Sequence, residues 1–306
     1  MDIEGRRRSD NFEDRGQGGG GRGAGIPVAL VGALVQRLGL RGSLVVAAIV
    51  GVGYFVLPAS LRQALFGAVT GQAASGSPGS AGGSACQASP ENGKACDFSR
   101  AVLASTEDVW SGEFQGGRLP RYGGRNPGAY QQPTLVVFAG GVSTSGCGNA
   151  SSDAGPFYCP GDRKLYIDPT FYEVMESRLK APGDFAQAYV IAHEVGHHVQ
   201  NLIGSTQVAV RGETKNQNSV RVELQADCLA GVWGHTARAS LKITDEDLRE
   251  AVNAAHAIGD DALGQRNSDD YTHGTSAQRM RWFHTGFDGG DARRCDTFAV
   301  EKYSQL

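Results

Sequence analysis

The sequence carries no large excess of charge of either sign, and it lacks a basic stripe. Its 306 residues include 29 Lys and Arg against 32 Asp and Glu, so the formal net charge at pH 7 is -3. Domains that bind nucleic acid concentrate basic residues on one face. We therefore expect no nucleic-acid partner. A chain of this length can hold one sizeable domain and additional segments.

Cysteine pairs of the C-x-x-C type are also missing, which excludes the common cysteine-based zinc sites. The six cysteines all follow residue 85, and an even number outside the cytoplasm favours disulfides. Proximity in sequence favours one of several possible pairings, namely Cys86–Cys96, Cys147–Cys159 and Cys228–Cys295.

Charge is absent from a long apolar run that extends from Gly42 to Leu61 between two arginines. A helix of this length can cross roughly 30 Å of hydrocarbon at about 1.5 Å per residue. Seven arginines precede the run (6, 7, 8, 15, 22, 37 and 41), whereas only Arg62 follows within the next stretch of similar length. The positive-inside rule then predicts a single-pass protein of the inner or cell membrane. Its N-terminus would be cytoplasmic and its main domain periplasmic or extracellular.

Two other interpretations of this run are weaker. A buried core helix would need a polar face, which the run lacks. A cleaved signal peptide would have a shorter charged leader and a small-x-small site soon afterwards. We therefore predict a disordered cytoplasmic tail over residues 1–41, a transmembrane helix over 42–61 and a Gly/Ser-rich linker over 62–84. An extracytoplasmic domain would follow over residues 85–306.

The patterns within the last segment predict an α+β domain that is mostly helical and has a small sheet. Short apolar runs at 134–140 and 163–169 favour strands. A helix is expected from Asp184, as N-cap, to about Ile203, and a second one from about 217 to 237. Thr244 and Thr275 are good N-caps for two further helices.

The stretch "YVIAHEVGHHVQ" (189–200) contains the pattern H-E-x-x-H. On a helix, His193 and His197 lie about 40° apart around the axis, so both imidazoles can reach one metal ion. Glu194 lies beside that face, where it can accept a proton from a water at the metal. The alternative is a buried helix that carries histidines by chance. Burying these groups without partners would cost several kcal/mol, which favours a zinc site.

A catalytic zinc site needs a third protein ligand. The metzincin pattern is excluded, because Gln200 and Ile203 stand where it requires glycine and histidine. The stretch "VELQADCLAG" instead offers Glu223 and Asp227, one helical turn apart. We assign Glu223 as the third ligand and Asp227 as the acceptor for the outer N–H of a zinc-bound histidine. A solvated helix face is the alternative for this pair, and Glu213 is a weaker ligand candidate in a polar loop.

The remaining histidines have no metal-binding spacing, and structural or surface roles are expected for His198, His235, His256 and His284. His273 differs because it precedes a capped helix, where its side chain could project into a cleft. There it could donate a hydrogen bond to the oxyanion of a tetrahedral intermediate, although a structural role is the alternative. Tyr271 has a similar, weaker claim.

Three stretches, "AHEVGHHVQ", "RVELQADCLAG" and "THGTSAQRMRWF", together resemble the neutral zinc metallopeptidase family of bacterial membrane-anchored proteins. The N-terminal "EGRRRSDN" and the apolar run after it are similar to that family too, so the resemblance covers nearly the whole chain. It implies a zincin-like peptidase domain. By the same resemblance, His193, Glu194 and His197 match the zinc motif, and Glu223 matches an E-x-x-A-D element.

These observations predict a membrane-anchored, zinc-dependent endopeptidase that acts on peptides or proteins. Zn²⁺ would be its cofactor, and Glu194 its general base. The strand at 134–139 or at 164–168 could bind substrate as an added strand. Two alternatives remain. One is a membrane-anchored scaffold whose structural zinc has a fourth ligand such as Asp227 or His273. The other is a zinc hydrolase that acts on non-peptide amides of the envelope.

Overall fold

The computed structural model describes residues 1–17, 83–124 and 127–306. Its larger sheet has the strand order β1-β2-β6-β5. The strands are β1 (Phe12–Gln17), β2 (Thr134–Ala139), β6 (Lys164–Ile167) and β5 (Phe157–Cys159). The first three are parallel, and β5 runs antiparallel to β6. Strands β2 and β6 are therefore interior, whereas β5 is an edge. A separate pair joins β3 (Gly141–Ser143) to β4 (Asn149–Ser151).

Strand β2 is the centre of the sheet because its sequence, TLVVFA, can be buried on both faces. Successive side chains of a strand point to opposite sides. Leu135 and Val137 accordingly belong to the main core, while Val136 and Phe138 pack in a smaller cluster on the other face. The predicted strands at 134–140 and 163–169 are confirmed as β2 and β6.

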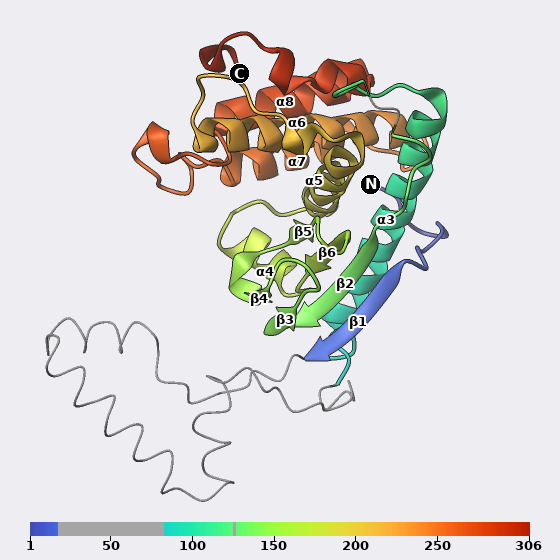
Figure 1. The fold of residues 1–306 in the computed structure, drawn as a ribbon. Helices are drawn as coiled ribbons and strands as arrows, with labels where there is room; N and C mark the ends of the chain where they lie inside the picture. The colour runs from blue at the N-terminus through green and yellow to red at the C-terminus, as the bar shows by residue number, and fades with distance from the viewer. Residues whose placement is uncertain (18–82, 125–126) are drawn as a thin grey trace, which may run out of the picture. The chain divides into compact units, whose positions relative to one another are not determined.

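Helices cover the sheet and contain far more of the described residues than the strands do, in agreement with the expected α+β, mostly helical domain. The helices are α3 (Pro90–Gly116), α4 (Phe171–Ser177), α5 (Asp184–Ile203), α6 (Lys215–Ala237), α7 (Asp245–Ala257) and α8 (Ser276–Gly289). Figure 1 shows α5 between the sheet and a layer formed by α6, α7 and α8, with α3 running along the sheet. The central position of α5 explains why most of its residues are buried.

The local signals for helix ends are mostly confirmed. α5 ends at Gly204, which adopts the left-handed conformation at φ 81°. Its N-cap, however, is Gly183 rather than Asp184. The Thr244 and Thr275 caps of α7 and α8 both form complete capping boxes. α6 begins two residues before the predicted start, because Thr214 forms a third capping box.

The N-terminal segment is folded, so the prediction of a disordered tail is wrong for residues 12–17, which form β1. Arg7 pairs with Glu107 at 2.8 Å, and Arg8 pairs with Asp97 at 2.6 Å. Both carboxylates belong to α3. Two of the seven arginines that had suggested a cytoplasmic tail therefore serve as ion-pair partners within the domain.

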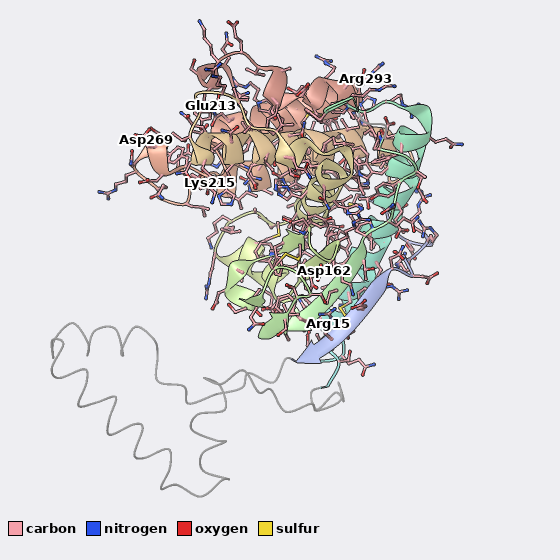
Figure 2. All side chains as sticks on the ribbon, in the orientation of Figure 1. Arg15, Asp162, Glu213, Lys215, Asp269 and Arg293 are labelled. Atoms are coloured by element: carbon pink, nitrogen blue, oxygen red, sulfur yellow. A yellow bond between two sulfur atoms is a disulfide. The ribbon has the colours of Figure 1, made fainter. Side chains whose placement is uncertain are left out.

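Strand β1 is also joined to the point where the described chain resumes. The Asp14 carboxylate accepts backbone N–H groups from Ala85 at 2.9 Å and from Cys86 at 3.1 Å. On the same strand, Arg15 (Figure 2) donates to the Ser143 carbonyl at 2.9 Å. These contacts hold a strand that has only one large apolar residue, Phe12.

The expectation of a transmembrane helix and a single-pass anchor has to be corrected. Within residues 1–17, 83–124 and 127–306, no helix has the length and apolar character needed to cross a bilayer. The predicted span at 42–61, and nearly all of the predicted linker, lie outside the described residues. The pairing of β1 with β2 also contradicts the predicted topology, in which the N-terminus and the main domain lie on opposite sides of a membrane. Paired strands lie about 4.8 Å apart, so β1 and β2 cannot stand on opposite sides of roughly 30 Å of hydrocarbon.

All three predicted disulfides are present. They join Cys86 to Cys96, Cys147 to Cys159 and Cys228 to Cys295. The third has the longest sequence separation, 67 residues, and ties α6 to the turn that follows α8. It therefore fixes the two helices that complete the site described next.

Candidate metal centre

Helix α5 presents two imidazoles side by side. His193 and His197 are one turn apart, and their ring centroids are separated by 4.7 Å. His193 is buried, and the His197 side chain is 17% exposed. The spacing of four residues therefore brings both imidazoles to the same face of the helix, as expected from the sequence.

Helix α6 brings a carboxylate to the same point. Gly196, inside the H-E-x-x-H pattern, lets α5 and α6 approach closely. A Cβ at this position would lie 2.9 Å from the Ala226 carbonyl oxygen and 3.1 Å from the Ala226 Cα. Glu223 lies one turn before Ala226 on α6. The glycine thus sets how near Glu223 comes to the two histidines.

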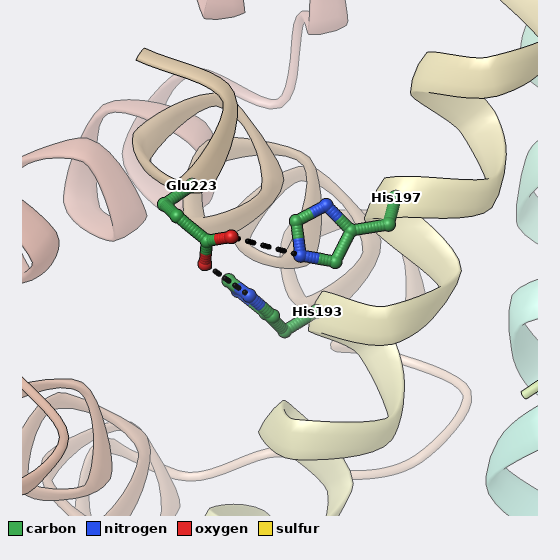
Figure 3. Close-up of side chains that lie close together, drawn as sticks. All are labelled: His193, His197 and Glu223. Atoms are coloured by element: carbon green, nitrogen blue, oxygen red, sulfur yellow. Dashed lines mark hydrogen bonds and ion pairs between the residues drawn. The ribbon is translucent and has the colours of Figure 1, made fainter. Parts of the chain in front are cut away.

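The three side chains converge, as Figure 3 shows. The Nε2 atom of His193 lies 3.2 Å from Glu223 Oε2, and that of His197 lies 3.5 Å from Glu223 Oε1. One ligand atom from each residue falls within 4.8 Å of the others. Ligands held at about 2.0–2.1 Å from a tetrahedral zinc are roughly 3.3 Å apart. The donor set and its spacing therefore fit a zinc ion.

The outer nitrogen of His193 is held by a buried carboxylate. Its Nδ1 lies 2.8 Å from Asp227 Oδ1, the contact that the sequence had predicted for Asp227. The Tyr189 hydroxyl donates to the same oxygen. Because the carboxylate accepts the Nδ1–H, the Nε2 of His193 is the nitrogen that faces Glu223 and can ligate a metal.

Gln200 performs the same task for His197, and the sequence analysis missed it. The Gln200 Nε2 donates to the Val222 carbonyl at 2.7 Å and to Gln225 Oε1 at 3.0 Å. Its Oε1 therefore faces His197 and accepts the Nδ1–H at 2.8 Å. The signal was available in principle, since Gln200 lies three residues after His197 on the same helix.

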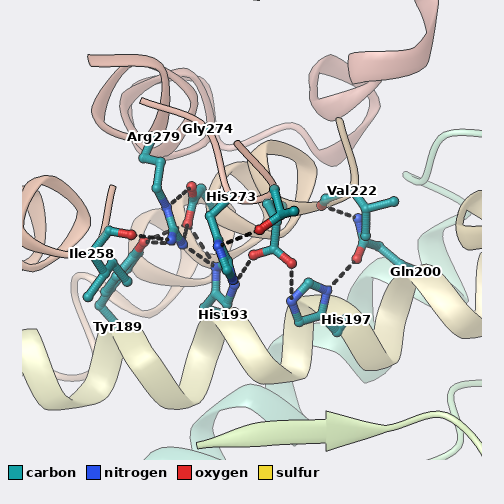
Figure 4. A network of polar contacts seen from close by, with 12 residues as sticks. Tyr189, His193, His197, Gln200, Val222, Ile258, His273, Gly274 and Arg279 are labelled. Carbon is teal, nitrogen blue, oxygen red and sulfur yellow. Dashed lines mark hydrogen bonds and ion pairs between the residues drawn. The ribbon is translucent and has the colours of Figure 1, made fainter. Parts of the chain in front are cut away.

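Arg279 of α8 is the second residue that was missed. It is buried, and it donates to both oxygens of Asp227 at 2.9 Å and to the Tyr189 hydroxyl at 3.3 Å (Figure 4). Trp282 and Phe283, three and four residues later, are also buried. An arginine on the apolar face of a helix requires a carboxylate partner, which is the signal that could have identified it.

Charge and burial act against each other in this cluster. Burial alone would lower the pKa of His193, but the charge and hydrogen bond of Asp227, together with Glu223, raise it to about 10. Burial opposes the ionisation of Glu223, yet the charges of His197 and His193 bring its pKa far below the usual range. Burial likewise opposes ionisation of Asp227, whose pKa is lowered by Arg279. Both carboxylates are thus anionic and suited to a cation.

The comparisons with known proteins agree with this geometry. The family described as "putative neutral zinc metallopeptidase" matches residues 1–298. The chain belongs to this family. Uncharacterized protein YpfJ of Escherichia coli (strain K12) is 43% identical over 310 residues, which cover 97% of this chain and 99% of that protein. Uncharacterized protein Rv2575 of Mycobacterium tuberculosis (strain ATCC 25618 / H37Rv) is 44% identical over 188 residues, 56% of this chain and 64% of that protein. No solved structure matches the chain.

In this member of the family, the cluster opens into a cleft of about 790 Å³. Glu194 lines the cleft together with His193, His197 and Glu223. Burial raises the pKa of Glu194, while the two histidines and a backbone hydrogen bond from Tyr158 act in the opposite direction. Tyr158 belongs to β5, so the edge of the sheet forms the wall of the cleft beside Glu194.

His273 also lines the cleft, on the side of α8. Its Nδ1 lies 3.1 Å from Asp260 Oδ1. Asp260 is itself fixed, because it accepts the backbone N–H groups of Thr272, His273 and Gly274 at 2.7–2.9 Å. In the described part of the chain, the His273 Nε2 has no hydrogen-bond partner. Tyr271, the weaker candidate, instead donates to the Gln265 carbonyl at 3.2 Å and does not line the cleft.

The remaining candidates take no part in the cluster. Glu213 pairs with Arg221 near the start of α6 (Figure 2), so it is not a ligand. His198 is buried between the Tyr158 hydroxyl and the Gln131 carbonyl, and His235 contacts the Phe287 carbonyl. Within the described residues, only His193, His197 and Glu223 form a group able to hold a metal.

Proposed function

We propose that this chain is a zinc-dependent endopeptidase. The observation that carries the proposal is the convergence of His193, His197 and Glu223 in a cleft that also contains Glu194. Two imidazole nitrogens and one carboxylate are a common donor set of catalytic zinc, which keeps a further position for water or substrate. Membership of the metallopeptidase family supports the same conclusion.

Each residue of the cluster has a defined task in this proposal. Zinc, when bound, would polarise a water and the scissile carbonyl. Glu194 accepts a proton from the attacking water and passes it to the leaving amine. Its partly buried position, which raises its pKa, helps it to do both. Asp227 and Gln200 hold the two imidazoles in the tautomer that offers Nε2.

We propose that His273 stabilises negative charge on the carbonyl oxygen. Asp260 accepts a hydrogen bond from its Nδ1–H at 3.1 Å, so Nε2 has a hydrogen to donate into the cleft only in the doubly protonated imidazolium form of the ring. A donor that is fixed before the reaction can stabilise an oxyanion without reorganisation. This supports the role that the sequence suggested for His273.

The prediction that substrate binds as an added strand cannot apply to β2 or β6, the two strands suggested by the sequence. β2 and β6 are interior, so both of their edges are already paired. β5 is an edge strand, and its residues Phe157 and Tyr158 line the cleft beside Glu194. We propose that substrate binds along β5, where backbone hydrogen bonds hold the peptide in extended form.

A scaffold with a structural zinc is less well supported. Such a site would need a fourth protein ligand. Asp227 is turned towards the Nδ1 of His193 and is covered by Arg279, and His273 is engaged by Asp260. Neither contact suits a closed metal site.

The test compares the full-length wild type with Glu194→Gln. Both proteins should bind one zinc, because Glu194 is not a ligand. Casein cleavage should fall by roughly 10²–10⁴-fold in the variant, the usual contribution of a general base. Glu301→Gln, a change at an exposed glutamate, is the matched control and should keep full activity. Unreduced cleavage by Glu194→Gln would refute its role, and zinc-loaded wild type without cleavage would refute the peptidase.

A further inference from the structure

The cleft has an apolar half that the metal chemistry does not use. Its lining there comes from α4, the segment after α4, α5, the end of α7 and the loop that follows α7: Phe171, Val174, Met175, Leu179, Ala181, Val190, Ala254, Ile258 and Leu263. Four of these side chains are almost fully buried and form the floor, with exposures of 1–7% for Met175, Ala181, Val190 and Ala254. The floor therefore carries no charge and offers only apolar contact.

This apolar half adjoins the metal cluster. Val190 lies three residues before His193 on α5, so it continues the stripe formed by His193 and His197. The distance along the helix axis is only about 4.5 Å. Successive residues of a peptide are about 3.8 Å apart. A substrate whose scissile carbonyl is at the metal would thus place a flanking side chain over Val190.

The rim of the cleft supports an apolar occupant. Leu263 is 57% exposed and is the one exposed large hydrophobic side chain among the described residues. The charged groups Asp153 and Arg178 line the cleft but are exposed and are not part of the floor. The other two such groups away from the metal cluster, Arg279 and His273, contact Asp227 and Asp260. A charged side chain in this half would therefore be desolvated without a counter-ion.

We infer that this half of the cleft is a specificity pocket for a bulky apolar side chain, such as leucine or phenylalanine, next to the scissile bond. The inference rests on the proposed function, because the metal cluster defines where the bond lies. Val174 of α4 and Ile258, the residue that caps α7, both line this half of the cleft, together with the buried Met175 and Val190.

Two small probes test the pocket without any catalysis. N-acetyl-leucine hydroxamate and N-acetyl-aspartate α-hydroxamate bind zinc through the same group and differ only in the flanking side chain. We would measure both by calorimetry on the full-length, zinc-loaded protein. Burial of a leucine side chain is expected to make the leucine probe bind roughly 10- to 100-fold more tightly.

Two variants of α4 distinguish the pocket from a general charge effect. Val174→Lys places a cation in the pocket, and it should reduce or reverse the preference for the leucine probe. Glu176→Lys adds positive charge two residues away, at an exposed position outside the cleft, and should leave the preference unchanged. Equal binding of both probes to the wild type, or an equal effect of both variants, would overturn the inference.

The two proposals can fail separately. If the leucine probe is preferred but casein is not cleaved, the pocket stands and the endopeptidase proposal fails. If casein is cleaved but the leucine probe has no advantage, the endopeptidase stands and the pocket is refuted.

Discussion

Gly196 offers a sharp test of how the two helices position the metal ligands. Alanine is favoured over glycine within a helix by about 1 kcal/mol. At Gly196, however, the new Cβ would be 2.9 Å from the Ala226 carbonyl oxygen. Overpacking of this kind costs about 1–3 kcal/mol. We expect Gly196→Ala to lower the free energy of unfolding by up to about 2 kcal/mol.

The same substitution at Gly112 is the control. Gly112 lies inside α3, and a Cβ there meets nothing within 4 Å, so Gly112→Ala should raise stability by about 1 kcal/mol. Urea unfolding of both full-length variants would show the opposite signs.

Zinc affinity should also respond to Gly196→Ala. To reach an ordinary contact distance, α6 must move away by about half an ångström, which exceeds the tolerance of about 0.2 Å for a metal–ligand distance. We expect zinc to bind at least about tenfold more weakly, as measured by competition with a chelator. Equal stabilisation by both alanines, together with unchanged zinc affinity, would refute the view that Gly196 sets the position of Glu223.

Three further predictions concern the charges around the site. Arg279→Met should leave Asp227 buried without its cation and lower the free energy of unfolding by about 3–5 kcal/mol, whereas Arg281→Met at an exposed position should change it little. The pKa of His193 is about 10 without metal, so this residue is protonated at pH 7. Zinc uptake by chelator-treated protein should then release about one proton and strengthen as pH rises from 7 towards 10, which calorimetry in several buffers can measure. Burial lowers the pKa of His198 from 6.5 to about 4, so the unfolded state binds more protons between these values. Stability should therefore fall as pH decreases from 6.5 to 4, by about 3 kcal/mol, in acid unfolding experiments.

Each of these three predictions can be contradicted by a specific experimental result. If Arg279→Lys and Arg279→Met are both as stable as the wild type, Arg279 does not compensate Asp227. Zinc binding that is independent of pH would show that His193 carries no proton to displace. His198→Gln should weaken the pH dependence of stability, whereas His284→Gln, at a partly exposed position, should not. The same slope in both variants would remove His198 as its cause.

The metal cluster was largely predictable because its signals are local. His193, Glu194 and His197 lie within one helical turn and a half, and Glu223 and Asp227 repeat the same spacing on the next helix. Helical geometry alone brings the members of each set to one face. The structure supplied what spacing could not, namely which faces meet and how near they come.

The failures share a different cause, which is contact between distant parts of the chain. Strand β1 pairs with β2 more than 100 residues later, and its sequence FEDRGQ shows no apolar alternation. Gln200 and Arg279 were missed because their roles depend on partners from other elements. The N-terminal arginines misled the topology, since a positive-inside count cannot detect that Arg7 and Arg8 pair with carboxylates of α3.

The hydrogen bonds that Asp14 accepts also matter for the design of a shortened protein. Because Asp14 binds the backbone of Ala85 and Cys86, the two described segments that end at Gln17 and begin at Gly83 lie close together. The entropy needed to join two fixed ends changes by only about 0.6 kcal/mol for each doubling of the residues between them. A short linker between Gln17 and Gly83 should therefore preserve the domain, whereas a truncation that begins near residue 80 would remove a strand of its sheet.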